Sequence, residues 1–114
     1  MKPRAGYHLP AMASVRLFVY GSLKRGGRHH DEWLQGATFL GEAETLAGYQ
    51  LEPLGEYLAL IAAPGSTAVV SGELFEVAAS KISVLDAFEG DAYMRATVPL
   101  RKFGLALAYL KKAR

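Results

Sequence analysis

The stretch "RLFVYGSLKRGGRHH", residues 16–30, decides how the fold begins. Its apolar residues alternate with their neighbours, so that Leu17 and Val19 share one face, which is typical of a β-strand. The pair Gly21 and Ser22 ends this strand, and five basic or titratable side chains follow before residue 31. We therefore predict a first strand that ends in a tight loop. The positive charge in this loop favours the binding of an anionic ligand.

The composition is that of one globular domain. A chain of 114 residues has the length of a single domain, and 51% hydrophobic with 21% charged residues exclude a disordered chain. Cysteine is absent, which excludes disulfides, a thiolate nucleophile and a cysteine-bound metal. No apolar run approaches the ~20 residues of a membrane span, and no apolar core of a signal peptide is present near residue 1. We expect a cytoplasmic protein.

The net charge of +2 comes from the two ends of the chain. Residues 12–110 hold 8 basic and 11 acidic residues, so the body of the domain is mildly acidic. A nucleic-acid site would need basic residues clustered on one face, and we therefore expect neither a nucleic acid nor a membrane as partner. We expect residues 1–14 to form a disordered N-terminal extension, residues 15–110 a single domain, and residues 111–114 a basic tail.

Runs of strand-forming residues broken by glycine and proline dominate the rest of the chain. They predict a bent strand within residues 37–55, a strand on each side of Pro64-Gly65 and two closing strands within residues 93–110. The second strand of the middle pair is expected to run from residue 67 to residue 77. With the first strand, this gives about six strands.

Two short segments have helical character. Residues 28–36 form one, with Trp33 and Leu34 turned inward, and residues 80–89 form the other, with Ser80 as its N-cap and Gly90 beyond its end. The sequence therefore predicts an α+β domain, a small mixed β-barrel that is partly closed, with two or three short flanking helices.

Glu89 is placed unusually for a charged residue. At 100° per residue it projects between Ile82 and Leu85, on the side of the helix that should be buried. Burial and the negative end of the helix dipole both raise the pKa of a carboxyl group, which suits proton transfer near neutral pH. The alternative is a solvated residue at a frayed helix end. Glu73 lies in a strand on the same face as Val69, Phe75 and Val77, and for it we favour a structural role, either edge-facing or hydrogen-bonded.

Several familiar motifs are incomplete. "GSLKRGG" lacks the Lys-Ser/Thr of a phosphate-binding loop, and no G-x-S-x-G surrounds Ser22 as a nucleophile. His29 and His30 are adjacent, so on a helix they would point ~100° apart and could not bind one metal together. We expect surface histidines, no metal and no cofactor.

Two segments in order carry a resemblance to a known family: "VYGSL", residues 19–23, and "LDAFEGDAYMR", residues 85–95. "GELFEV", residues 72–77, and "ALAYL", residues 106–110, agree with it. The chain resembles the gamma-glutamylcyclotransferase-like family, in its AIG2-like and gamma-glutamylamine cyclotransferase branch, from about residue 15 to residue 110. The order of the paired motifs at this chain length makes the resemblance fairly specific.

The resemblance implies a small mixed β-barrel with a cavity beside the first loop. It also implies cleavage of a gamma-glutamyl amide by intramolecular attack, which releases 5-oxoproline and a free amine without metal or cofactor. The acidic residue of the family falls on Glu89. The binding loop falls on Tyr20, Gly21, Ser22 and Leu23, and the family's Y-x-R motif falls on Tyr93 and Arg95. The hydroxyl group of Tyr93 is expected near the cavity as a substrate-binding group, and Arg95 is expected to support the site by fixing its strand or by pairing with a carboxylate. The alternative is a purely structural pair at the start of a strand.

The resemblance and the position of Glu89 lead to one hypothesis. A single carboxyl group near both nitrogens could move a proton from the attacking amine to the leaving amine of a small gamma-glutamyl substrate. Backbone N–H groups after the strand could hold a carboxylate or an oxyanion. Two alternatives remain open: a non-catalytic small-molecule-binding domain of the same fold, and, ranked last, a nucleic-acid-binding barrel. The family often has an Asn where this chain has "RHHDEW", which leaves the substrate open.

Overall fold

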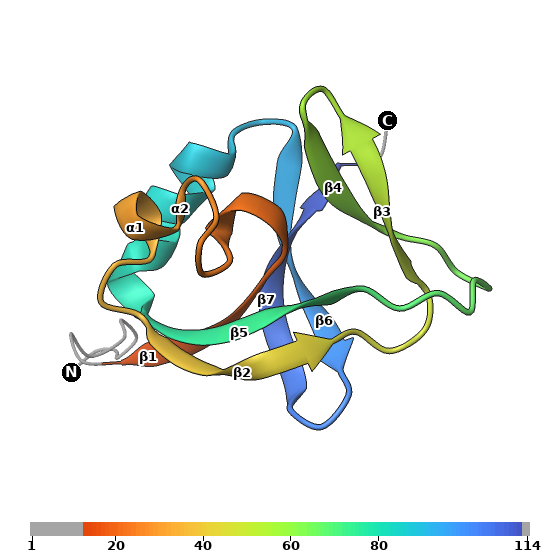
Figure 1. Cartoon of the computed structure of the whole chain (residues 1–114), viewed down its shortest axis with the longest axis horizontal. Coiled ribbons are helices and arrows are strands. Elements are labelled where there is room, and N and C mark those ends of the chain that lie inside the picture. The colour runs from red at the N-terminus through yellow and green to blue at the C-terminus, as the bar shows by residue number, and fades with distance from the viewer. Residues whose placement is uncertain (1–12, 113–114) are drawn as a thin grey trace, which may run out of the picture.

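Seven β-strands and two α-helices make up the computed structural model, which describes residues 13–112 (Figure 1). The strands are β1 Ser14–Val19, β2 Thr38–Glu44, β3 Tyr49–Leu54, β4 Tyr57–Ala62, β5 Ser71–Ala78, β6 Tyr93–Leu100 and β7 Gly104–Lys111. The α-helices are α1 His30–Trp33 and α2 Ile82–Glu89, and the short 3₁₀ helices are η1 Gly21–Leu23 and η2 Ala79–Lys81.

The sheet takes in one residue from each segment expected as a tail. Ser14 begins β1, and Lys111 ends β7, where its ammonium group contacts the carboxylate of Glu52. Residues 1–12 and 113–114, which make up the rest of the two expected tails, lie outside the described residues.

All seven strands belong to one mixed sheet, in the order β2-β5-β1-β7-β4-β3, with β6 paired to β7 outside this path. The predicted first strand, β1, lies between antiparallel β5 and parallel β7. No strand pairing joins β2 to β3 in the described part of the chain, so the sheet is open and the expected barrel is not confirmed. A single antiparallel bridge, Thr45 with Leu100, ties the chain beyond β2 to the end of β6.

The strand count exceeds the prediction by one. Residues 37–55, expected as one bent strand, contain both β2 and β3, which pair with β5 and β4 respectively. Gly48, between them, has a φ of 107°, a backbone conformation that favours glycine and lets the chain change direction. β5 begins at Ser71, four residues later than predicted, because the backbone of Val70 and Ala68 bonds to Thr45 and Gly48 instead of to a strand.

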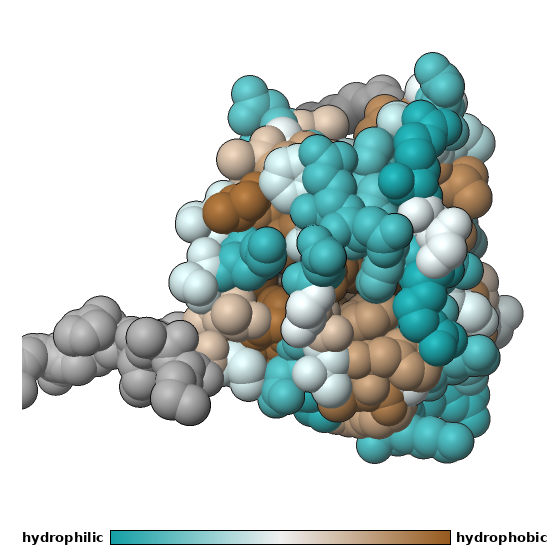
Figure 2. Space-filling view, turned by 60° about the vertical axis from the view of Figure 1, so that its left-hand side comes forward, coloured by the Kyte–Doolittle hydropathy of each residue, from teal (hydrophilic) through white to brown (hydrophobic). Residues whose placement is uncertain are grey.

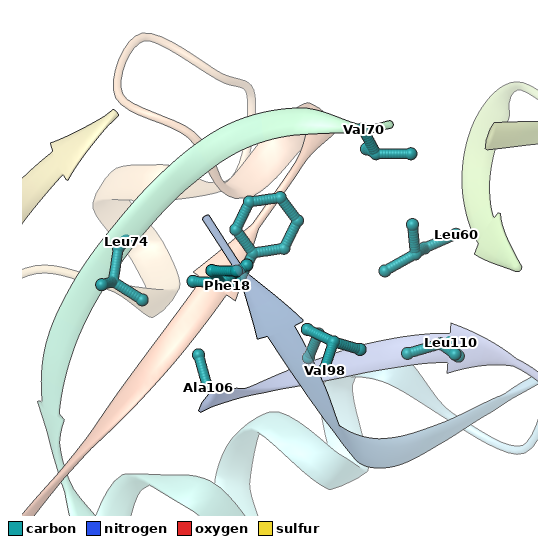
Figure 3. Close-up of a cluster of buried hydrophobic side chains, with 9 residues drawn as sticks. Phe18, Leu60, Val70, Leu74, Val98, Ala106 and Leu110 are labelled. Atoms are coloured by element: carbon teal, nitrogen blue, oxygen red, sulfur yellow. The ribbon is translucent and has the colours of Figure 1, made fainter. Parts of the chain in front are cut away.

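Two clusters of buried side chains fill the two sides of β1. Phe18, 1% exposed, belongs to the first cluster, whose members point toward one another from several strands (Figure 3). Leu17 and Val19 belong to the second cluster, where Leu34 and Leu85 bring in the two helical segments. The alternation predicted for the first strand is confirmed, and the strand carries the core on both faces.

The last turn of α2 ends as predicted, whereas its start differs. Gly90 has a φ of 80°, and its N–H donates to the carbonyl of Asp86 at 3.1 Å, which closes the helix. The prediction of Ser80 as N-cap is wrong, because Ser80 lies inside η2, which leads directly into α2. The helix therefore begins later than expected but delivers Glu89 at its final position.

The surface of the domain mixes hydrophilic side chains with a smaller number of apolar ones on the face turned toward the reader in Figure 2. Among residues 13–112, ten large apolar side chains are exposed, and they include Tyr57 and Leu58 at the start of β4. Within residues 13–112, no helix is long and apolar enough to cross a membrane.

Candidate active site

A cavity of about 440 Å³ opens where β1 ends and η1 begins. Tyr20, Gly21 and Leu23 line it from the loop, while Glu89 and Tyr93 line it from the end of α2 and the start of β6. The fold therefore brings together, at one cavity, residues that the sequence analysis selected from two distant segments.

The two other predicted residues, Ser22 and Arg95, lie on η1 and β6 respectively. Ser22 is the central residue of η1, and its side chain lies outside what the structure describes. Arg95 lines a second, smaller cavity of about 270 Å³. The two cavities share Glu89, Tyr93 and Tyr109, so that Glu89 lies at the junction between them.

Glu89 is half-buried, and burial raises the pKa of its carboxyl group to about 7. The predicted direction of this shift is confirmed, and desolvation is its physical cause. Within residues 13–112, no hydrogen bond or ion pair to a protein group engages the carboxyl oxygens of Glu89. The carboxyl group is thus available to a ligand, and near neutral pH it is present both with and without its proton.

Three tyrosines surround Glu89. Tyr20 donates its hydroxyl hydrogen to the carbonyl oxygen of Tyr109 at 2.5 Å, and Tyr93 shares both cavities with Glu89. Burial raises the pKa of the hydroxyl groups of Tyr20, Tyr93 and Tyr109, and the nearby carboxylate of Glu89 adds to the effect. Each phenol therefore keeps its proton at physiological pH and can act as a neutral hydrogen-bond donor.

Asp86, one turn before Glu89 on α2, has a protein partner for each oxygen of its carboxylate. The hydroxyl of Tyr109 donates to Oδ1 at 2.6 Å, and the guanidinium of Arg95 donates to Oδ2 at 2.6 Å. Sequence analysis left open whether Arg95 fixes its strand or pairs with a carboxylate, and the structure shows that it pairs with Asp86. This network joins α2, β6 and β7 behind Glu89.

The loop after β1 is fixed by side chains from elsewhere in the fold. Gly21 has a φ of 77°, which favours glycine, and His30 donates through Nδ1 to the carbonyl oxygen of Leu23 at 2.8 Å. Glu73 accepts a hydrogen bond from the backbone N–H of Arg25 at 2.7 Å and pairs with its guanidinium at 3.2 Å. The structural role predicted for Glu73 is confirmed, and Arg25 serves to hold the loop.

The outer part of the cavity was not predicted from the sequence. Its wall consists of His29, Tyr57, Leu58 and Phe88, which come from the loop before α1, the start of β4 and the end of α2. His29 was expected at the surface, but its ring packs edge-on against Phe88 at 5.2 Å between ring centres and lines the cavity. The sequence signal that could have marked it is the replacement of the Asn that the resembled family carries in this segment.

Tyr109 was also missed, although it lies within the closing segment "ALAYL". It is 5% exposed, and a buried tyrosine in a strand needs a partner for its hydroxyl group, which here is Asp86. In the part of the chain that the structure describes, no group of three His, Asp or Glu residues could hold a metal ion. The cavity is therefore lined by the half-buried carboxyl group of Glu89, the exposed carboxylate of Glu56, neutral phenols, a backbone loop and an outer wall made mostly of rings.

Sequence comparison relates this chain to known proteins. Residues 17–114 match the family described as "Gamma-glutamyl cyclotransferase, AIG2-like". A gamma-glutamylaminecyclotransferase of Rattus norvegicus is 37% identical over 95 residues, which cover 76% of this chain and 64% of the relative. The chain thus spans slightly less than two thirds of the length of that relative.

Solved structures agree with the sequence match. An uncharacterised protein from Pyrococcus horikoshii superposes with a TM-score of 0.74 at 30% identity, over 88% of this chain and 80% of the other. An AIG2-like protein from Mus musculus superposes with a TM-score of 0.70 at 25% identity, over 88% of this chain and 77% of the other. From its family match over residues 17–114, the chain belongs to the AIG2-like gamma-glutamyl cyclotransferase family.

Proposed function

We propose that the protein is a gamma-glutamyl cyclotransferase that converts a gamma-glutamyl amine or gamma-glutamyl amino acid into 5-oxoproline and a free amine. The observation that carries the proposal is Glu89, whose carboxyl group lines the cavity without a hydrogen-bond or ion-pair partner in the described part of the chain, and whose pKa is raised by burial to about 7. A general acid and base works best when its pKa lies near the working pH, because both protonation states are then available. Membership of the family supports the same reaction.

In the proposed reaction, the neutral α-amine of the substrate attacks the γ-carbonyl carbon of the same molecule. The new C–N bond closes a five-membered ring, and the attacking nitrogen passes one proton to the carboxylate of Glu89. The tetrahedral centre then collapses, the original amide C–N bond breaks, and the leaving nitrogen takes the proton from Glu89. The carboxylate is restored, so the step needs no other reactant.

The cavity supports this chemistry in two further ways. A substrate confined beside η1 would be held in the folded shape that ring closure needs, which removes much of the entropic barrier. The first N–H groups of a short helix have no partner within it, so those of Gly21, Ser22 and Leu23 are proposed to bind the α-carboxylate or the developing oxyanion. Tyr20, at the start of this binding loop, also lines the cavity, and its hydroxyl group is held by a hydrogen bond to the carbonyl oxygen of Tyr109.

Tyr93 and Arg95 receive separate roles in the proposal. Tyr93 lines both cavities next to Glu89, and its neutral hydroxyl group is proposed to donate a hydrogen bond to the substrate. Arg95 pairs with Asp86 and is proposed to act as a supporting residue that keeps Tyr109 in place. One continuous sheet from residue 14 to residue 111 supports the treatment of residues 15–110 as a single domain.

The test is the release of 5-oxoproline from a panel of gamma-glutamyl amino acids and amines, with wild type beside Glu89→Gln. We expect wild-type turnover and a loss of about 10²- to 10⁴-fold in kcat for the variant, because the amide of Gln cannot carry the proton. Glu42→Gln is the matched control, since Glu42 is an exposed carboxylate on β2 outside both cavities. It should retain wild-type activity.

A domain that binds such compounds without cleaving them is the alternative outcome. In that case wild type and Glu89→Gln would bind the same gamma-glutamyl compound in calorimetry, and neither would release 5-oxoproline. That result would replace the proposed enzyme with a small-molecule-binding domain of the same fold.

A further inference from the structure

We infer that the amine released by this protein carries an apolar side chain, and that an aromatic ring is its best occupant. The inference rests on the proposed function and concerns the outer wall of the cavity, formed by His29, Tyr57, Leu58 and Phe88. Three of these four side chains are rings, and none of them takes part in the proposed proton transfer.

The orientation of the substrate follows from the arrangement of the cavity. The glutamyl half is assigned to the inner end, where the loop after β1 and Glu89 lie together. Phe88 and Glu89 are consecutive at the end of α2, so the outer wall begins beside the carboxyl group that must reach the leaving nitrogen. Whatever is attached to that nitrogen therefore extends along the outer wall.

The rings of the outer wall are held in place by other rings. Trp33 stacks on Phe88 with 4.5 Å between ring centres and 29° between ring planes. The other neighbour of Phe88, His29, meets it edge-on at 5.2 Å and 66°, and the ring of Tyr57 lies 6.5 Å from that of His29. A wall whose rings are already oriented receives another ring at low entropic cost, since aromatic pairs favour stacked or edge-on contacts.

The outer wall also has apolar surface left to cover. Tyr57 is 43% exposed and Leu58 is 51% exposed. The next residues of β4, Ala59 and Leu60, are fully buried, so the wall is mounted on an anchored strand. An apolar group seated against these side chains would remove their surface from water, which is the main source of affinity in such a pocket.

Charge at the outer wall does not favour one sign of ligand. Glu56 lines the cavity as an exposed residue, while the guanidinium of Arg28 lies 5.7 Å from the ring centre of Tyr57 and donates to its hydroxyl oxygen at 3.4 Å. Glu56, which lines the cavity, and Arg28, which contacts Tyr57 in its wall, carry opposite charges and together give little net preference for a cationic or an anionic leaving amine. Apolar contact is left as the property that distinguishes one leaving amine from another.

The decisive measurement compares kcat/KM for gamma-glutamyl-phenylalanine and gamma-glutamyl-glycine, since both release 5-oxoproline and one assay serves for both. We expect the phenylalanine compound to be favoured by about tenfold or more, because its ring fills the outer wall and glycine leaves it empty. Equal values, or a preference for glycine, would overturn the inference and leave the proposed function standing. Silence on both compounds, with turnover of other gamma-glutamyl compounds in the panel, would overturn the inference alone. Silence on the whole panel would overturn the proposed function, and this inference with it.

A pair of variants locates the effect. Leu58→Ala should lower the ratio of the two kcat/KM values by about fivefold, because it removes apolar surface from the outer wall. Leu51→Ala is the control: Leu51 is 38% exposed on the adjoining strand β3 and does not line the cavity. It should leave the ratio at the wild-type value. A wild-type ratio in Leu58→Ala would overturn the assignment of this wall to the leaving amine.

Discussion

Two carboxyl groups in the last turn of α2 have opposite surroundings. Asp86 is held by Tyr109 and Arg95 at 2.6 Å each, whereas Glu89 lines the cavity with no protein partner within residues 13–112. Asp86 and Glu89 are three positions apart on α2. The carboxylate of Asp86 connects the helix to β6 and β7, whereas the carboxyl group of Glu89 faces the cavity. The difference teaches that one helix can supply a paired carboxylate that supports the fold and, one turn later, an unpaired carboxyl group at a cavity, to which we assign the proposed proton transfer.

The largest expected effect comes from moving the Glu89 carboxyl group. Glu89→Asp keeps the acid but withdraws it by one methylene, and we expect kcat for 5-oxoproline release to fall by about 10²-fold, since such a displacement disturbs proton transfer. Asp86→Asn should cost about tenfold or less, because it acts only through the position of its neighbours. Steady-state kinetics of the two variants provide the test. A greater loss for Asp86→Asn than for Glu89→Asp would reverse the roles assigned to the two groups.

The second prediction concerns stability and pH. Burial raises the pKa of Glu89 to about 7 from 4.5, so the folded state holds this proton more tightly than the unfolded state does. The resulting contribution to stability is complete below pH 4.5 and is lost as the pH rises through about 7. Glu89→Gln avoids this loss, and at pH 8 it should be more stable than wild type by about 1–2 kcal/mol, after allowance for solvent screening.

Urea unfolding of wild type and Glu89→Gln at pH 4, 6 and 8 measures this difference. The stabilities of the two proteins should diverge as the pH rises. A difference that is constant across the series would mean that desolvation of the carboxylate does not act at this position.

The third prediction tests the paired group. Tyr109→Phe removes the hydroxyl group that donates to Asp86, and we expect the free energy of unfolding to fall by about 1 kcal/mol, as is usual for the loss of one hydrogen bond to a partly exposed carboxylate. Urea unfolding at pH 7 gives the value. Unchanged stability would show that the Asp86 network contributes nothing to the attachment of α2 to β7.

The smallest effect is expected at Arg95. Its ion pair with Asp86 is short, but the side chains are 39% and 43% exposed, so water and salt screen the attraction. Arg95→Gln should lower the free energy of unfolding by about 0.5 kcal/mol or less, and added salt should reduce the difference further. A loss of more than 2 kcal/mol, unaffected by salt, would place Arg95 among the major supports of the fold.

The parts of the site that could be predicted are those with a local signal. The alternation of Leu17, Phe18 and Val19 indicates β1 and both of its buried faces, and Gly90 marks the end of α2, from which the position of Glu89 follows. Helical periodicity then places Glu89 beside Leu85. Each of these inferences uses residues within a few positions of one another.

The parts that could not be predicted depend on contacts between distant segments. His29 and Tyr57 meet at the cavity only because β4 pairs with the parallel strand β7, and no local pattern in the chain specifies that pairing. The division of residues 37–55 into β2 and β3 has the same origin, since each strand follows a different partner. The error at Ser80 is of another kind. Serine is a good N-cap residue by its local chemistry, but the chain folds Ser80 into the short 3₁₀ helix η2 that leads into α2.

Because Trp33 stacks on Phe88, its intrinsic fluorescence can report on the state of the cavity. The sequence has one tryptophan, so its fluorescence emission arises at a single place, one ring away from the outer wall of the cavity. Its indole N–H is buried and has no hydrogen-bond partner among residues 13–112, and its ring packs against Phe88, so the emission has an apolar surrounding in the folded protein. The spectrum will therefore shift toward the red on unfolding, and a ring bound against Phe88 will register in the same signal without any added dye.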